Sequence, residues 1–196
     1  MAVFGQLVIG PPQSEAEPSS GVTGIRALGT VRAGTIVLCT NAYTSRLTPT
    51  RVRPVRGQML ATAPTAPVFE RPAYAKRGSQ YWRQRADGRV LVGGWRDTAV
   101  DEEVGAEERT TTGIQAHLDA FLNEHGIDAP VTHRWAGTMG FSHDALPYVG
   151  HTGPRLFVCG GFTGHGMAFA PASAEMIAAL VRTGSHPDAD LFDPSR

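Results

Sequence analysis

The sequence predicts an α/β (α+β) fold into which a largely antiparallel β lobe is inserted. Residues 156–159 form a short apolar run that leads through a glycine-rich turn into a helical pattern. Residues 35–40 form a second apolar run, rich in β-branched side chains and without alternation, which suits a strand covered on both faces. Between these two runs, short alternating segments are separated by turn residues, a pattern typical of antiparallel strands. The two kinds of pattern therefore predict two lobes.

The composition sets limits on size and on partners. A chain of 196 residues is long enough for one domain or for two small lobes. Its 18 basic and 18 acidic residues cancel, so we expect neither nucleic acid nor a membrane as a partner. No apolar run approaches the length of a membrane span and no secretory signal is evident, so we expect a cytoplasmic protein.

The two cysteines, Cys39 and Cys159, lie in apolar, strand-like runs. Buried free thiols are the favoured interpretation there, and a disulfide stays open as an alternative. Neither the cysteines nor the histidines have the spacing of a metal site, so no metal is expected.

The glycine-rich turn precedes a helix that we expect from about Pro171 to Arg182. Glycine at this density is costly in backbone entropy, so we expect positive φ angles or a close approach of backbones. The turn matches neither GxGxxG nor the Walker A pattern. From the pattern alone, two interpretations are open: a plain strand-to-helix turn, or a helix N-terminus that faces an electron-rich ligand edge.

The middle of the chain, residues 51–129, predicts strands with one helix. Asp87 and Gly88 predict a hairpin between two strands, and a helix is expected from about Glu107 to His125. The acidic residues 101–103 are expected to be either a solvated run or the lead-in to this helix. If an arginine binds a substrate carboxylate, five residues are candidates, although each is more readily explained as a surface residue. The five are Arg51, Arg53, Arg56, Arg83 and Arg96.

Three stretches carry a resemblance to a known family. Residues 160–181, GGFTGHGMAFAPASAEMIAALV, contain the glycine turn and its helix, and residues 39–43, CTNAY, follow the other apolar run. The pattern W-x-G…D-x-x-P-x-[IV]-G is formed by Trp135, Gly137, Asp144, Pro147 and Gly150. In this order, the three stretches resemble the FAD-dependent amine and amino-acid oxidoreductases of the D-amino-acid oxidase, glycine oxidase and sarcosine oxidase superfamily.

The resemblance implies a partial, Rossmann-like FAD-binding lobe made of residues 21–50 and 130–196. The inserted lobe, residues 51–129, would bind substrate, and residues 1–20 are expected to be a flexible segment. The implied cofactor-binding residues lie in the two turns and in the tryptophan motif: Thr40, Asn41, Ala42, Gly137, Gly160, Gly161, Phe162, Thr163, Gly164, His165, Gly166 and Met167.

Two positions depart from the sarcosine oxidase branch. Gly137 stands where that branch has the cysteine that holds its flavin covalently, so non-covalent FAD is implied. Ala168 stands where that branch has a lysine for the substrate carboxylate. The resemblance therefore does not extend to sarcosine oxidase itself.

The GxGxxG fingerprint that binds the ADP part of FAD is absent, so the resemblance covers only the C-terminal half of the family pattern. The implied function is oxidation of the C–N bond of a small amine or amino acid by hydride transfer to flavin, with this chain supplying the isoalloxazine and substrate side. The alternative is a non-catalytic, truncated fragment or subunit that needs a separate chain carrying the GxGxxG unit. An unrelated binding domain is the third interpretation.

The sequence does not identify the residues that would carry out catalysis. We assign no catalytic residue and no general base. Some relatives have a lysine near the flavin that assists oxygen, and the sequence does not settle whether the only lysine here, Lys76, corresponds to it. Oxidase and dehydrogenase both stay open, with a dehydrogenase or electron-transferring enzyme favoured.

Overall fold

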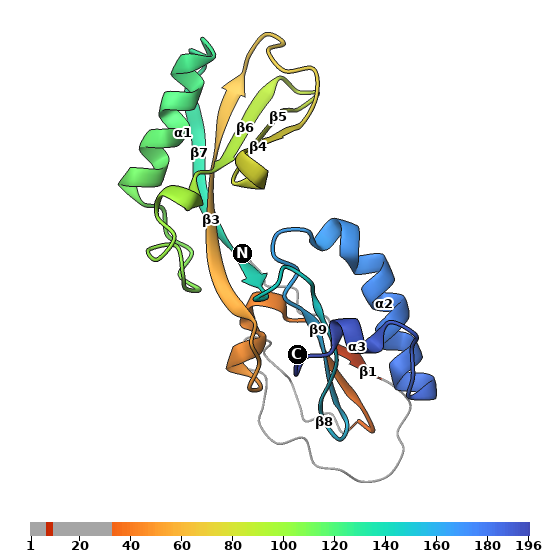
Figure 1. Cartoon of the computed structure of the whole chain (residues 1–196). Coiled ribbons are helices and arrows are strands. Elements are labelled where there is room, and N and C mark those ends of the chain that lie inside the picture. Colours follow the sequence, from red (N-terminus) through yellow and green to blue (C-terminus); the bar gives the residue numbers. More distant parts are fainter. Residues whose placement is uncertain (1–6, 10–32) are drawn as a thin grey trace. The chain divides into compact units, whose positions relative to one another are not determined.

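The computed structural model describes residues 7–9 and 33–196 (Figure 1). The chain divides into two units. The first unit holds the described part of Met1–Pro54 together with Met139–Arg196, and the second unit is Val55–Thr138. The assignment of the lobes to FAD and to substrate stays a prediction. Most of the expected flexible segment, and the residues between 21 and 32, lie outside the described residues.

The first unit is built on a four-stranded sheet in the order β1-β2-β9-β8. Its strands are β1 (Leu7–Ile9), β2 (Ile36–Leu38), β8 (Tyr148–Gly153) and β9 (Leu156–Gly160). Strands β2 and β9 pair in parallel, whereas β1 pairs with β2, and β8 with β9, in the antiparallel sense. The sheet is therefore mixed.

Helix α2 (Gly166–Thr183) packs against this sheet (Figure 1). Their shared core consists of Val37, Val149, Phe157, Cys159, Met176, Ile177 and Leu180. The prediction that the helix begins at Pro171 was wrong, because the glycine turn already becomes helical at Gly166 and Pro171 lies inside the helix. The helix ends at Gly184, whose φ of 78° suits a glycine, and a short helix α3 (Ala189–Phe192) follows.

The second unit contributes to a five-stranded sheet in the order β4-β5-β6-β3-β7. These strands are β3 (Arg53–Pro64), β4 (Ala73–Ala75), β5 (Gln80–Gln84), β6 (Arg89–Gly94) and β7 (Val131–Phe141). The pairs β4–β5, β5–β6 and β6–β3 are antiparallel. The hairpin predicted at Asp87 and Gly88 is confirmed, since it joins β5 to β6 and Gly88 has a φ of 82°.

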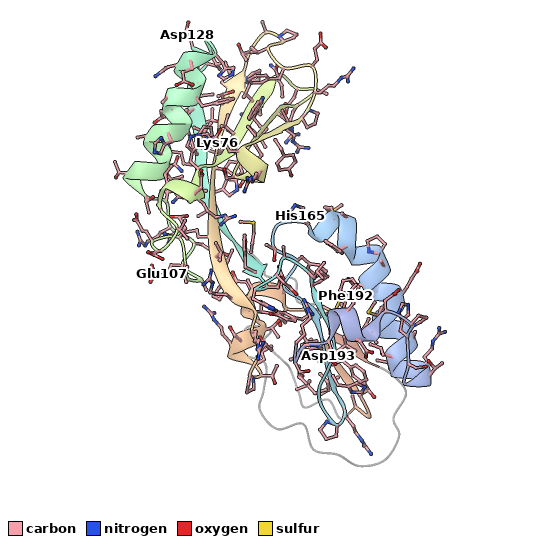
Figure 2. The ribbon with its side chains drawn as sticks, viewed as in Figure 1. Lys76, Glu107, Asp128, His165, Phe192 and Asp193 are labelled. Atoms are coloured by element: carbon pink, nitrogen blue, oxygen red, sulfur yellow. The ribbon has the colours of Figure 1, made fainter. Side chains whose placement is uncertain are left out.

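Helix α1 (Thr112–Glu124) covers one face of that sheet (Figure 1). Its apolar stripe packs on Leu60 of β3 and on alternate residues of β6, in a core made of Leu60, Val90, Val92, Trp95, Ile114, Leu118, Phe121, Leu122 and Ile127. The helix begins later than the predicted Glu107. Short 3-10 helices η1 (Asn41–Arg46), η2 (Lys76–Gly78) and η3 (Arg96–Thr98) lie in connections, and Figure 2 labels Lys76 at the start of η2.

The structure corrects two expectations about charged residues in the second unit. Glu103 was expected to be solvated and Arg56 to lie on the surface, yet their side chains are 0% and 2% exposed. Arg56 Nη2 donates to Glu103 Oε1 at 2.8 Å, and the carbonyls of Glu102 and Glu107 accept further bonds from the same guanidinium. Gln58 Nε2 also donates to Glu103 Oε1, so both buried charges are compensated. These contacts also fix the backbone before α1 in a non-helical path.

Helices long and apolar enough to cross a membrane are not found in the described part of the chain. Residues 7–9 and 33–196 likewise contain no group of three or more His, Cys, Asp or Glu side chains that could hold a metal ion. The cytoplasmic location stays a prediction.

Candidate functional site

The predicted flavin-contacting turns follow two neighbouring parallel strands of the first unit. Strands β2 and β9 pair in register, with Leu38 opposite Val158. Because the carboxyl ends of parallel strands meet at one edge of a sheet, the turn after β2 and the turn after β9 lie side by side. The structure thus brings Asn41 close to Gly160 and Gly161, and the contact of these turns with flavin stays a prediction.

Asn41 joins the two turns. Its side-chain oxygen Oδ1 accepts a hydrogen bond from the backbone N–H of Gly161 at 2.9 Å, across 120 residues of sequence. Asn41 has a φ of 44°, a left-handed conformation that asparagine tolerates better than most residues. A Cβ at Gly160 would lie 3.1 Å from the Cα of Asn41, so glycine allows this close approach.

Residues at the end of β7 also form hydrogen bonds with the glycine turn. The N–H of Thr163 donates to the carbonyl of Gly140 at 2.8 Å, and the N–H of Ser142 donates to Thr163 Oγ1 at 3.0 Å. Phe141 and Phe162 also form an isolated β-bridge. We did not predict Gly140 or Ser142 as site residues. Glycine inside a strand pattern was the available signal, since it marks a close backbone approach.

The other side of the glycine turn is open. Gly164 and His165 are exposed, and Met167 is 95% exposed. The carbonyl of Thr163 can only accept, so His165 Nδ1 donates to it at 2.9 Å and Nε2 is left without the proton in the neutral ring. Figure 2 labels His165 beside the start of α2.

The start of α2 leaves backbone donors available. The carbonyl of His165 accepts from the N–H groups of Ala168 and Phe169. Among the residues that the structure describes, the N–H groups of Gly164, Gly166 and Met167 have no backbone acceptor. Together with the positive end of the helix dipole, these donors suit an electron-rich, planar ligand edge such as the pyrimidine side of an isoalloxazine ring. The turn therefore fits the part of FAD that the resemblance assigns to it.

The remaining predicted site residues have different surroundings. Ala42 is 2% exposed, and Thr40 shares a hydrogen bond between side-chain oxygens with Thr44 at 3.0 Å. Phe162 packs against the core beneath α2. Gly137 belongs to the second unit and has no atom within 4 Å of a Cβ built on it, so its contact with flavin stays a prediction.

Asp144, from the third resembling stretch, forms an ion pair with Arg196, which we call the clamp. Its carboxylate accepts from Arg196 Nε at 2.9 Å and from Nη2 at 3.1 Å, while Nη2 also donates to the carbonyl of Leu146. The guanidinium lies 4.4 Å from the ring centre of Tyr148. The Arg196 guanidinium holds the pKa of the Asp144 carboxyl well below its usual range. Asp144 is therefore a structural carboxylate rather than an acid or base.

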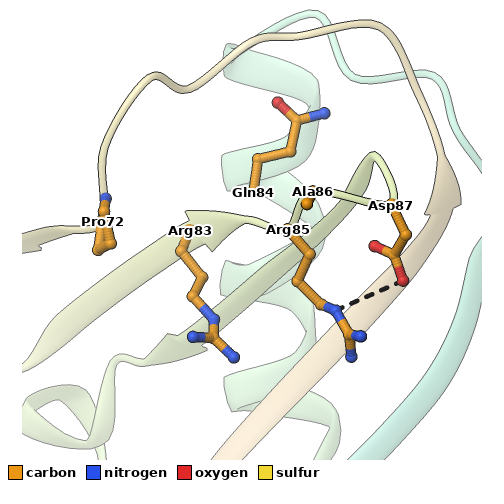
Figure 3. A pocket seen from close by; sticks show the side chains of 6 residues that line it. All are labelled: Pro72, Arg83, Gln84, Arg85, Ala86 and Asp87. Carbon is orange, nitrogen blue, oxygen red and sulfur yellow. Dashed lines mark ion pairs between the residues drawn. The ribbon is translucent and has the colours of Figure 1, made fainter.

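The arginines considered for a substrate carboxylate differ in the contacts that their side chains make. The guanidinium of Arg56 is engaged by Glu103 and backbone carbonyls, which leaves it unsuited to a substrate. Arg51 donates to the carbonyl of Arg196 at 2.6 Å. Arg83 is exposed and lines a hollow of the second unit together with Arg85, which pairs with Asp87 at 3.4 Å (Figure 3).

Comparisons with known proteins agree with the geometry of the turns. A family model described as "DAO: FAD dependent oxidoreductase" matches residues 7–180. The chain belongs to this family. Glycine oxidase of Pseudomonas putida, a DAO relative, is 30% identical over 187 residues, which are 89% of this chain and 48% of that protein. The probable oxidoreductase OrdL of Rhizobium meliloti is 26% identical, over 84% of this chain and 39% of that protein.

Solved structures show the same fold. Glycine oxidase from Geobacillus kaustophilus superposes with a TM-score of 0.70 at 24% identity, over 87% of this chain and 47% of that chain. L-proline dehydrogenase from P. horikoshii gives a TM-score of 0.69 at 20% identity, over 85% of this chain and 47% of that one. The predicted mixed α/β fold with an antiparallel lobe is thereby confirmed. The chain spans about half, or less, of the length of these DAO relatives.

Proposed function

We propose that this chain supplies the isoalloxazine and substrate side of an FAD-dependent amine or amino-acid oxidoreductase. The observation that carries the proposal is the open glycine turn, whose N–H groups at Gly164, Gly166 and Met167 lack backbone acceptors in the described part of the chain. Membership of the DAO family supports flavin as the ligand. When bound, FAD supplies the chemistry by accepting the two electrons of the C–N oxidation.

The chain's own residues would bind and orient the cofactor. The free N–H groups of the turn would donate to the electron-rich edge of the ring, and the positive end of α2 would favour negative charge there. Asn41 keeps the two turns in one arrangement through its bond to Gly161. Gly137 has no thiol, so binding would be non-covalent.

For the substrate, we propose a small amine or amino acid. The names of two similar proteins, a glycine oxidase and an L-proline dehydrogenase, support this class. A substrate carboxylate would require a cation, and we propose Arg53 or Arg83 for that role. We favour a dehydrogenase or electron-transferring enzyme over an oxidase. Rapid reoxidation of the reduced flavin by oxygen would reverse that preference.

The ADP half of FAD needs a GxGxxG unit, which this sequence does not contain. We propose that a separate chain supplies it. The second candidate function, a non-catalytic subunit, rests on the same observation, because the turns alone would contact only the ring side of the cofactor.

One reconstitution experiment tests these proposals. The chain is mixed with FAD and with the part of the P. putida glycine oxidase that it does not match, which we expect to carry the GxGxxG unit. We expect the chain to be retained in a complex that holds yellow flavin through gel filtration, and the flavin to be bleached without oxygen by glycine, sarcosine or proline. A flavin-holding complex that none of a full set of amino acids and amines bleaches would leave the non-catalytic subunit as the function. A flavin-loaded partner to which this chain adds neither binding nor bleaching would overturn both.

A further inference from the structure

The two cysteines of the chain lie opposite each other on neighbouring strands. Strands β2 and β9 are parallel and in register up to Leu38 and Val158, and Cys39 and Cys159 are the next residues of each. Neighbouring strands are about 4.8 Å apart, which lies within the Cα separation that a disulfide spans. Both side chains pack in the same apolar core, so the two thiols lie on one face of the sheet.

Both thiols point to the face of the sheet that α2 covers. Cys159 belongs to the core with Met176, Ile177 and Leu180, and Cys39 packs against the same core. Val149 is the partner of Cys159 on β8. The neighbours of the pair are thus apolar, and the largest influence on the pKa of each thiol comes from the other.

The two thiols differ in exposure and in acidity. Cys159 is 7% exposed, whereas Cys39 is half-buried and accessible from solvent. The hydrogen bond from Cys159 lowers the pKa of Cys39 from 9.0 to about 7, and the same contact together with burial raises the pKa of Cys159. The lowered pKa increases the thiolate fraction of Cys39 at neutral pH, and the thiolate is the form that attacks a disulfide.

We propose that Cys39 and Cys159 form a redox-active dithiol, which low-molecular-weight disulfides oxidise to an intramolecular disulfide between β2 and β9. The Cys39 thiolate attacks one sulfur of the small disulfide and releases one thiolate. Cys159 then loses its proton to solvent and attacks the Cys39 sulfur, releasing the second thiolate. In total the dithiol gives up two electrons and two protons, and the small disulfide becomes two thiols.

The position of the pair links this chemistry to the candidate site. Thr40 directly follows Cys39, and Gly160 directly follows Cys159, so the disulfide would join the chain at the base of both turns. The reaction itself requires no flavin, and it stands whether or not the proposed function does.

The test uses the full chain, without flavin, in mixtures of oxidised and reduced glutathione. After acid quenching, free thiols are alkylated with iodoacetamide and the peptides are identified by mass spectrometry. We expect both cysteines to lose alkylation together, with recovery of a disulfide-linked peptide pair. A wild-type chain whose two cysteines stay alkylated, or carry only glutathione, would overturn the proposal.

Variants at each cysteine test the assigned roles. Cys159→Ser keeps a hydrogen-bond donor beside Cys39, and we expect it to accumulate a glutathione adduct at Cys39. Cys39→Ser leaves the buried thiol, which should react at least about tenfold more slowly. Cys159→Ala removes the donor, so the midpoint of Cys39 alkylation against pH should rise from near 7 towards 9. Equal reactivity of the two single variants, with native circular dichroism, would refute Cys39 as the attacking thiol.

Discussion

The side-chain oxygen Oδ1 of Asn41 lies 2.9 Å from the backbone nitrogen of Gly161, and this hydrogen bond joins the turn after β2 to the turn after β9. It replaces water as the partner of a buried N–H group, because Gly161 is buried. The arrangement of the candidate flavin site therefore depends on one side chain from a distant part of the sequence.

Substitutions at Asn41 should distinguish the contribution of its hydrogen bond to stability from that of its left-handed backbone conformation. Asn41→Gly keeps the left-handed φ of 44° but leaves the Gly161 N–H without its acceptor. We expect a loss of about 1–3 kcal/mol in the free energy of unfolding, measured by urea denaturation. Asn41→Asp retains an acceptor oxygen and should lose less. Equal stability of Asn41→Gly and wild type would show that the bond contributes nothing.

Two glycines of the turn allow a matched comparison of alanine substitutions. Gly161 and Gly164 have φ values of 76° and 83°, so alanine is strained at both by about 1–2 kcal/mol. A Cβ at Gly161 would also lie 3.0 Å from Tyr148 Cδ2, whereas a Cβ at Gly164 meets only the sulfur of Met139 at 3.9 Å. Gly161→Ala should therefore be the more destabilising substitution in urea denaturation. The reverse order would contradict the packing described here.

The buried ion pair of the second unit should be sensitive to the loss of one partner. Arg56→Ala leaves Glu103 buried without its cation, and we expect a loss of about 3–5 kcal/mol in the free energy of unfolding. The double variant Arg56→Met/Glu103→Leu removes both charges and should be more stable than the single one. The control is Glu102→Ala, an exposed neighbour whose effect should stay within about 0.5 kcal/mol. A single variant no less stable than the double variant would contradict the assignment.

Acid should weaken the clamp between Asp144 and Arg196. Because Arg196 lowers the pKa of Asp144 in the folded state, the ionised carboxylate stabilises the fold above the unfolded pKa of about 3.9. This contribution is lost as the pH falls below that value towards the folded pKa. Asp144→Asn should show a shallower decline of the melting temperature between pH 5 and pH 2. Because Asp144 is 30% exposed and the pair is screened, the difference should shrink in high salt.

Local patterns predicted the parts of the fold that depend on neighbouring residues. The hairpin at Asp87 and Gly88, the strand within residues 35–40 and the end of α1 near His125 are all found. Each depends on periodicity or on a turn residue within a few positions. The start of α2 was misplaced because Pro171 is a favourable first residue, whereas a proline within the helix is tolerated here.

By itself, the sequence determined the family, the glycine-rich turn and the two kinds of lobe, because short motifs and hydrophobic periodicity are enough to indicate them. Only the tertiary structure decided that Asn41 binds Gly161, that Arg56 and Glu103 are buried together and that Cys39 lies beside Cys159. Each of these pairs joins residues far apart in the chain. The stability of a buried polar or ionised group depends on the partner that the fold places beside it, and composition or spacing does not carry that information.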